Sequence, residues 1–134
     1  MDVGFIQVHR KLVNSSFYND SEAVHLWIHL LFKARFSDGK YWVKDEEIML
    51  KAGQFVTGRK VLSAETKINE SKIQRLMKRF EKCHMIEQQT NSVSRLITIV
   101  NYNEYQSSEQ QMNNKRTTSE QQVNNERTLN NNVN

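Results

Sequence analysis

The stretch RKVLSAETKINESKIQRLMKRFEK, residues Arg59 to Lys82, decides the fold. It predicts two short helices joined by a tight turn at Ile68-Asn69. The turn and the second helix hold six basic residues against Glu70 and Glu81, an excess of four positive charges, which equals the formal net charge of the chain. The basic residues are Lys67, Lys72, Arg75, Lys78, Arg79 and Lys82. A helix-turn-helix that carries all of the net charge favours a DNA-binding element.

Apolar spacing sorts the faces of the second helix, which is predicted to run from Glu70 to Lys82 with Asn69 as its N-cap. Ile73, Leu76, Met77 and Phe80 recur at helical spacing, so they predict the buried face. The opposite face then shows Ser71, Gln74, Arg75, Lys78 and Lys82. Arg and Gln can bond base edges and Lys can neutralise phosphate, so this face suits a major-groove reader. A solvated basic face on a packing helix is the alternative.

The segments before this stretch predict a helix and several short strands. Residues 4–12 predict a short strand or a helical turn, and Ser21 to Phe36 predict a long helix with N-cap residues just before it. Residues 41–43 and 48–50 predict strands around a turn at Asp45-Glu46-Glu47. Phe55-Val56 predicts another strand, and Thr57 is the expected N-cap of the helix that begins at Arg59.

The segments after Lys82 predict a β-hairpin. Met85 to Thr90 and the β-branched run Arg95 to Val100 flank the polar turn at 90–92. Helix, strand, helix, helix, strand, strand is the order of a winged helix. The sequence therefore predicts an α+β fold, a winged helix-turn-helix with a small antiparallel β-wing over residues 1–106.

Residues 107–134 form a neutral tail rich in Asn, Gln, Ser and Thr. SEQQMNNKRTT from Ser108 repeats as SEQQVNNERTL from Ser119, a period of 11 residues. Each unit holds too few apolar residues for a coiled-coil seam, so the tail is predicted to be disordered. A unit is encoded by about 33 nucleotides, close to three turns of B-DNA. The protein repeat therefore reflects either repeated binding sites in the gene or simple low-complexity expansion.

Length and composition bound the class of protein. The chain of 134 residues allows one small domain with a tail, and its mean hydropathy is −0.73. A pI near 9.3 fits a polyanionic partner but is also common in ordinary soluble domains. The single cysteine, Cys83, excludes an intrachain disulfide, and there is no membrane-length apolar run or signal-peptide layout. We expect a cytoplasmic protein.

Five segments together resemble the N-terminal domain of phage replication initiators, the replisome organisers similar to DnaD-type primosomal proteins. They are GFIQVHRKLVNSSFYND, LWIHLLFKARF, AGQFVTGRKVLSAET, INESKIQRLMKRFEKCHMIE and LITIVNYNEYQ, which cover roughly residues 3 to 106. The stretches GQFVTGRK and IVNYNEYQ are the most specific. The resemblance implies a winged helix that binds origin or other replication DNA, with self-association and a helicase loader as further partners. Relatives usually continue into a second helical domain, whereas this chain ends in the tail, so helicase recruitment is not carried over.

The residues expected to contact double-stranded DNA lie on both helices and on the wing. They are Arg59, Lys60, Ser71, Lys72, Gln74, Arg75, Lys78, Arg79, Lys82 and Arg95. Arg59 and Lys60 begin a helix, where phosphate is often bound, and Arg95 with the tip Gln88-Gln89-Thr90-Asn91 could meet phosphate or the minor groove. For these residues an ordinary exposed charge or polar turn is an equally good interpretation.

Other chemistry finds little support in the sequence. His25 and His29 are only two ligands, and Cys83-His84 has no third group to orient it, so neither a metal site nor a catalytic pair is expected. No phosphate-binding GxxxxGK[ST] motif is present. We therefore expect no enzyme activity, cofactor or metal. Trp27, Tyr41 and Trp42 are expected to be core residues rather than stacking platforms for single strands.

Three functions follow from this interpretation. The first is origin recognition in phage or prophage DNA replication. The second is transcriptional regulation with the same fold, and the third is a winged helix that serves protein-protein assembly.

Overall fold

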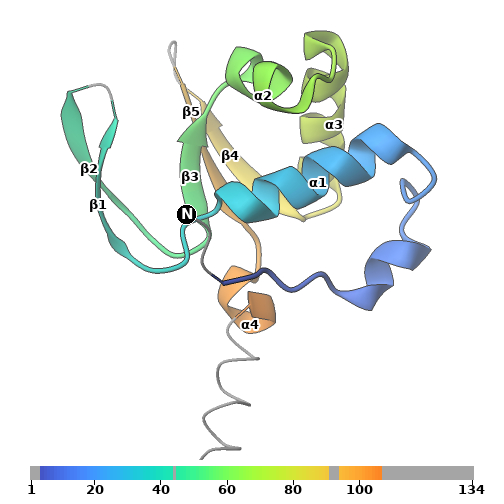
Figure 1. Cartoon of the computed structure of the whole chain (residues 1–134), viewed down its shortest axis with the longest axis horizontal. Helices are drawn as coiled ribbons and strands as arrows, with labels where there is room; N and C mark the ends of the chain where they lie inside the picture. The colour runs from blue at the N-terminus through green and yellow to red at the C-terminus, as the bar shows by residue number, and fades with distance from the viewer. Residues whose placement is uncertain (1–3, 44, 91–93, 107–134) are drawn as a thin grey trace, which may run out of the picture. The chain divides into compact units, whose positions relative to one another are not determined.

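The structure is a computed structural model that describes residues 4–43, 45–90 and 94–106 (Figure 1). Chain contacts define one unit of residues 1–102 and a second of residues 103–134. The expected tail and its repeat, like Asn91 of the expected tip, lie outside the described residues. In chain order the elements are a 3-10 helix η1 (Arg10–Asn14), α1 (Ser21–Lys33), β1 (Gly39–Val43), β2 (Glu46–Leu50), β3 (Gln54–Thr57), α2 (Arg59–Thr66), α3 (Glu70–Lys82), β4 (Ile86–Thr90), β5 (Arg95–Ile99) and α4 (Tyr102–Gln106).

Helix α1 begins where its cap residue was predicted and ends earlier than predicted. The Asp20 carboxylate accepts hydrogen bonds from the backbone N–H groups of Glu22 and Ala23 at 3.1 and 3.3 Å. The helix ends at Lys33 rather than Phe36, because the backbone of Arg35 bonds to the segment that enters β3. The Arg35 N–H donates to Gln54 O at 3.1 Å, and the Gly53 N–H donates to Arg35 O at 2.8 Å.

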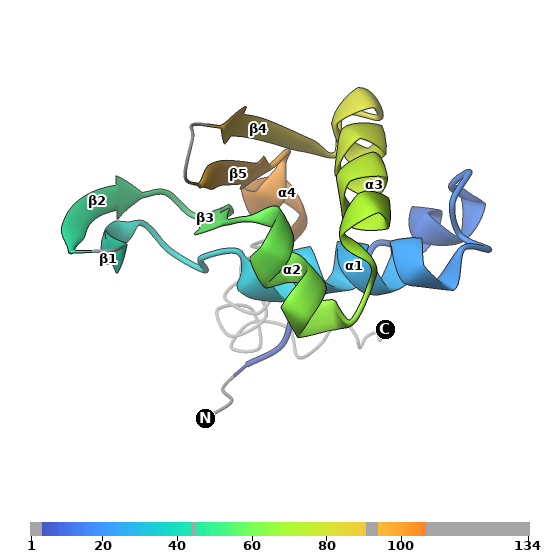
Figure 2. The ribbon, with the colours of Figure 1, turned by 90° about the horizontal axis from the view of Figure 1, so that it is seen from above.

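The strands form two separate antiparallel sheets (Figures 1 and 2). Strands β1 and β2 form a two-stranded sheet, the first hairpin, whose turn contains Asp45 with a φ of 62°. The expected turn at Asp45-Glu46-Glu47 was wrong in part, because Glu46 and Glu47 belong to β2 and pair with Val43 and Trp42. The second hairpin, β4 and β5, joins β3 in a sheet of order β3-β5-β4.

Helices α2 and α3 are joined by the tight turn that the sequence predicted. Lys67 takes the left-handed conformation with a φ of 65°, Ile68 is buried, and Asn69 caps α3 by accepting from the Ser71 N–H at 2.8 Å. The expected cap of α2 was wrong. Gly58 occupies that position, while Thr57 is buried at the end of β3.

The core lies between the three longer helices and the three-stranded sheet. Phe80 of α3 is fully buried, with Phe17 at 5.2 Å and Trp27 edge-on at 5.6 Å between ring centroids. The predicted inward residues of α3 are all buried, and so is Ile97 of the central strand. The α+β class is confirmed, and α1, β3, α2, α3, β4 and β5 follow the predicted order.

Candidate nucleic-acid interface

Helix α3 presents three polar strips around its buried face. Directly opposite the buried residues, an outer strip spans an arc of about 60° at 3.6 residues per turn. It consists of Ser71, Arg75, Lys78 and Lys82, all exposed. Among the described residues, none of these side chains has a hydrogen-bond or ion-pair partner. The outer strip is therefore the part of α3 that is available to an external ligand.

A second strip of α3, Lys72 and Arg79, is bonded to the N-terminal segment and to the start of α1. Lys72 Nζ lies 3.1 Å from both Asp20 Oδ1 and Glu22 Oε1, at the start of α1. Hydrogen bonds to these two carboxylates raise the pKa of Lys72, and the bond from Lys72 holds the pKa of Asp20 below its usual value. Arg79 donates to Ser16 Oγ at 2.9 Å. These two predicted DNA ligands thus have internal partners.

The third strip of α3, Gln74 and Glu81, lies on the other side of the outer strip and is hydrogen-bonded to the second hairpin. Arg95 donates to Gln74 Oε1 at 2.6 Å and to Gln88 Oε1 at 3.3 Å. Gln88 in turn donates to Glu81 Oε1 at 3.1 Å. Burial lowers the pKa of Arg95, and the nearby charge of Arg59 lowers it further. The chain of bonds fixes the hairpin against α3 and brings Arg95 close to the start of α2.

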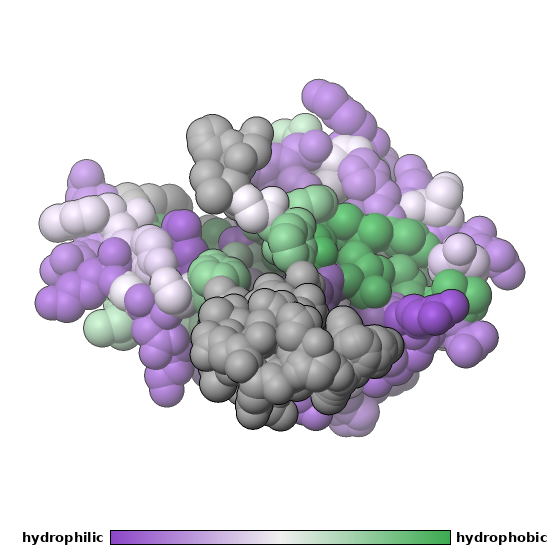
Figure 3. All heavy atoms as spheres, turned by 60° about the horizontal axis from the view of Figure 1, so that its bottom comes forward, coloured by the Kyte–Doolittle hydropathy of each residue, from purple (hydrophilic) through white to green (hydrophobic). Residues whose placement is uncertain are grey.

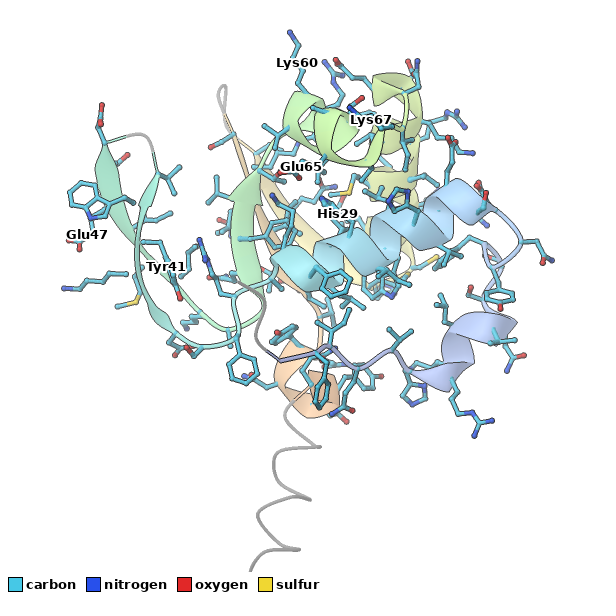
Figure 4. All side chains as sticks on the ribbon, in the orientation of Figure 1. His29, Tyr41, Glu47, Lys60, Glu65 and Lys67 are labelled. Carbon is cyan, nitrogen blue, oxygen red and sulfur yellow. The ribbon has the colours of Figure 1, made fainter. Side chains whose placement is uncertain are left out.

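The start of α2 places two more predicted residues near α3. Arg59 Nε lies 3.4 Å from Glu70 Oε1, an ion pair between two half-exposed side chains. Lys60 is exposed and projects away from the fold in Figure 4, and Lys67 of the turn is exposed as well. The N-cap residue of α2 is Gly58, which has no side chain to accept a hydrogen bond from the first N–H groups of the helix. These N–H groups lie beside the basic residues Arg59 and Lys60, and the combination favours phosphate binding.

A cluster on the other side of α2 fixes that helix to α1. His29 and Glu65 point toward one another in Figure 4, with His29 Nε2 2.9 Å from Glu65 Oε1. Lys33 Nζ lies 3.1 Å from both carboxylate oxygens of Glu65. Burial raises the pKa of Glu65, but the bonds from His29 and Lys33 outweigh it, and the pKa is lowered. These pairs orient α2, and through it the turn that carries α3.

Sequence reasoning found the basic residues but could not find their partners. Lys72 and Asp20 are 52 positions apart, and Arg79 and Ser16 are 63 apart, so no local pattern links them.

Of the predicted tip, Gln88 is half-buried while Gln89 and Thr90 are exposed. Across the described residues no helix is long and apolar enough to cross a membrane, and no three His, Cys, Asp or Glu side chains group as metal ligands.

The fold is a small α+β domain in which two helices form a basic helix-turn-helix and a β-hairpin packs beside the second of them. Comparison with known protein families then identifies the family to which the chain belongs. The family model described as the N-terminal phage replisome organiser matches residues 9–128. The chain therefore belongs to the N-terminal phage replisome organiser family, as the resemblance indicated, and the match extends into the polar tail. No curated protein and no solved structure matches the chain.

Proposed function

We propose that this chain is a winged-helix protein that binds double-stranded DNA and recognises a phage replication origin. The observation that carries the proposal is the outer strip of α3. Within the described part of the chain, Arg75, Lys78 and Lys82 have no partner and stand in one row with Ser71, while the residues on either side of the row brace the helix. A rigid helix with free donors on its outer face suits the major groove.

The neighbouring elements support the same proposal. The N-terminus of α2 has no side-chain cap and carries Arg59 and Lys60. Its first backbone N–H groups and these two basic side chains could bind the phosphates of a DNA backbone. The second hairpin is bonded to α3 through Arg95, which supports a role for this hairpin as the wing. Membership of the replisome organiser family favours replication over transcription as the process served.

Two single variants of the outer strip test DNA binding. Arg75→Ala and Lys78→Ala should each weaken binding about tenfold, or about 1.4 kcal/mol. Each lost phosphate contact should also make the slope of log K against log salt shallower by about 0.9. Fluorescence anisotropy across a salt series measures both quantities. Lys51→Ala, an exposed lysine outside α2, α3 and the second hairpin, is the matched control and should bind like wild type.

The choice of DNA separates origin recognition from promoter recognition. A footprint should be sought on the gene segment that encodes residues 108–129 and on a random duplex of equal length. Protection confined to the encoded repeat would support origin recognition and the interpretation of the repeat as binding sites. If Arg75→Ala and Lys78→Ala bind every duplex as wild type does, the proposed DNA-binding surface is wrong.

A further inference from the structure

Gln74 lies between the outer strip of α3 and the second hairpin. It comes three positions after Ser71 and four positions before Lys78, so it adjoins both residues on the surface of the helix. The Gln74 side chain is half-buried, whereas the residues of the outer strip are exposed. A ligand that lies along the outer strip would therefore pass directly beside the Gln74 amide.

The hydrogen bond with Arg95 fixes the direction of the Gln74 amide. Arg95 Nη2 donates to Gln74 Oε1 at 2.6 Å. A guanidinium has N–H donors and no acceptor, so the NH2 group of Gln74 cannot exchange places with the oxygen. Among the described residues this NH2 group has no partner. Gln74 thus keeps a free donor group whose position is determined by Arg95.

The bonds on the other side of Arg95 hold its guanidinium in place. Arg95 Nη1 donates to Gln88 Oε1 at 3.3 Å, and Gln88 Nε2 donates to Glu81 Oε1 at 3.1 Å. An ionised Glu81 only accepts, so the chain of bonds cannot run in the opposite direction. Arg95 is itself half-buried, and it belongs to the central strand of its sheet. The fold therefore orients Gln74 before any ligand is bound.

We propose that Gln74 is a specificity-determining residue that donates from its NH2 group to atom N7 of one purine in the major groove, with Arg95 as its positioning residue. This role rests on the proposed function, because Gln74 belongs to the same DNA-binding surface. Atom N7 is an acceptor on the major-groove edge of adenine and of guanine. Lysines of the outer strip suit phosphate, whereas the uncharged Gln74 amide suits a base edge.

Both purines fit an amide that is held in this direction. With adenine, the Gln74 oxygen can also accept from the N6 amino group, and with guanine the NH2 group can donate to both N7 and O6. Cytosine presents only a donor on its major-groove edge. A cytosine at the contacted position would therefore leave the NH2 group of Gln74 without an acceptor. We expect Gln74 to discriminate against cytosine on the strand that it contacts.

Selection of binding sites by the full chain from a pool of randomised duplexes tests this role. The wild type should select a site with a purine at the contacted position. Gln74→Glu keeps an acceptor for Arg95, so the fold is retained, but it has no donor for N7. The variant should therefore prefer a base that presents a donor, such as cytosine, at that position alone.

Removal of the acceptor atom measures the bond itself. A 7-deazapurine at the contacted position forms the same base pair but has a C–H group in place of N7. The wild type should bind this duplex about tenfold more weakly than the unmodified site, whereas Gln74→Ala should bind the two duplexes equally. Equal losses in the wild type and in Gln74→Ala would overturn the assignment, because another residue would then contact N7.

Two variants of Arg95 test whether it positions Gln74. Arg95→Lys still has only donors, so it should keep the preference for a purine. Arg95→Gln can accept as well as donate, so the Gln74 amide can turn over and the preference should weaken at that position alone. Thermal unfolding of both variants measures any general loss of stability. An unchanged preference in Arg95→Gln would overturn the positioning role of Arg95.

Apolar side chains that are exposed elsewhere provide the control. Figure 3 shows an apolar area on one face of the molecule, and on the first hairpin Trp42 is 71% exposed. The expectation that Trp42 is a core residue was wrong, because the alternation of the strand turns it outward. An aromatic ring can stack on any base, so Trp42→Ala should select the same site as the wild type. A changed preference at the contacted position in Trp42→Ala would instead assign the recognition to the first hairpin.

Two negative results distinguish the role of Gln74 from the proposed function. If the wild type selects a site and Gln74→Glu selects the same one, DNA recognition stands and only the role of Gln74 is wrong. If the wild type enriches no sequence from the pool, origin recognition is wrong, and the role of Gln74 is wrong with it.

Discussion

The two hairpins of this protein have similar lengths and opposite surroundings. Each consists of two five-residue antiparallel strands. In the second hairpin, β5 is the central strand of its sheet, with Ile97 fully buried and Arg95 bonded to α3. In the first hairpin no third strand is described, and Trp42 and Met49 face outward.

This difference shows that secondary structure and role are set by different features of the chain. Short alternating strands around a polar turn are enough to specify a hairpin in both places. What each hairpin does depends on what packs against it. The second hairpin is held as part of the core and of the candidate DNA surface, whereas the first leaves Trp42 and Met49 exposed on one face.

The largest expected difference between the hairpins is in their contribution to stability. Ile97→Ala should lower the free energy of unfolding by about 2–5 kcal/mol, because it leaves a cavity in the core. Ile48→Ala in the first hairpin should cost less than about 1.5 kcal/mol, since Ile48 is only half-buried. Urea unfolding followed by circular dichroism measures both. Equal losses would show that the first hairpin is part of the cooperative core.

The next difference is in the contribution of one arginine to each hairpin, Arg95 in the second and Arg35 beside the first. We infer that Arg95 positions the second hairpin and makes no phosphate contact of its own. Arg95→Met keeps the aliphatic stem but loses the bonds to Gln74 and Gln88, so stability should fall by about 1.5 kcal/mol. DNA affinity should fall while the salt slope stays unchanged, which distinguishes it from Lys78→Ala.

Arg35→Met is the matching change in the first hairpin. It removes a cation-π contact with Tyr41 and should cost only about 0.5–1 kcal/mol, with no effect on DNA binding. A salt slope that becomes shallower in Arg95→Met would show that Arg95 does contact phosphate.

Much of the fold could be predicted from the sequence because its signals are local. The inward residues of α3, the Asp20 and Asn69 caps and the order of the elements all follow from spacing and cap chemistry. The Thr57 cap failed because burial at the end of a strand outweighed the side-chain preference. The exposure of Trp42 could not be foreseen, since alternation defines two faces but does not say which one the core covers.

The candidate site was predictable only as a set of basic residues. The sequence places Arg75, Lys78 and Lys82 on the same side as Ser71 and Gln74. It could not show that Gln74 is bound to Arg95 or that Lys72 and Arg79 are bound to the N-terminal segment, because those partners are brought together by the tertiary fold. Long-range hydrogen bonds and the Lys72 ion pairs show which of the ten predicted residues have partners within the fold, and the outer strip of α3 has no partner among the described residues.

A smaller effect should appear when the carboxylates are titrated. Asp20 and Glu65 have lowered pKa values in the folded state because they are bonded to Lys72 and to His29 with Lys33. Their stabilisation is therefore present above the ordinary pKa of 3.8 for Asp20 and 4.5 for Glu65, and it is lost as the pH falls through the folded values. Stability should be level near neutral pH and decline below about pH 4.

Neutral variants separate these carboxylates from those of the first hairpin. Asp20→Asn keeps a good N-cap but loses the charge pair with Lys72, so it should reduce stability at pH 7 by no more than about 1 kcal/mol and flatten the acid decline. Glu46→Gln should leave the profile as it is, because no ion pair joins Glu46 to another described residue. Thermal unfolding between about pH 2 and pH 7 would compare them.

The smallest expected effect is that of Trp42→Ala on stability. A side chain that is 71% exposed loses little contact on truncation, so unfolding at about 1 μM should change by less than about 0.5 kcal/mol. The unfolding curves of the wild type and of Trp42→Ala should therefore nearly coincide. If Trp42→Ala lowered the free energy of unfolding by more than about 1 kcal/mol, Trp42 would be stabilising the hairpin itself. The contrast between a hairpin that builds the core and one that exposes a surface would then be wrong.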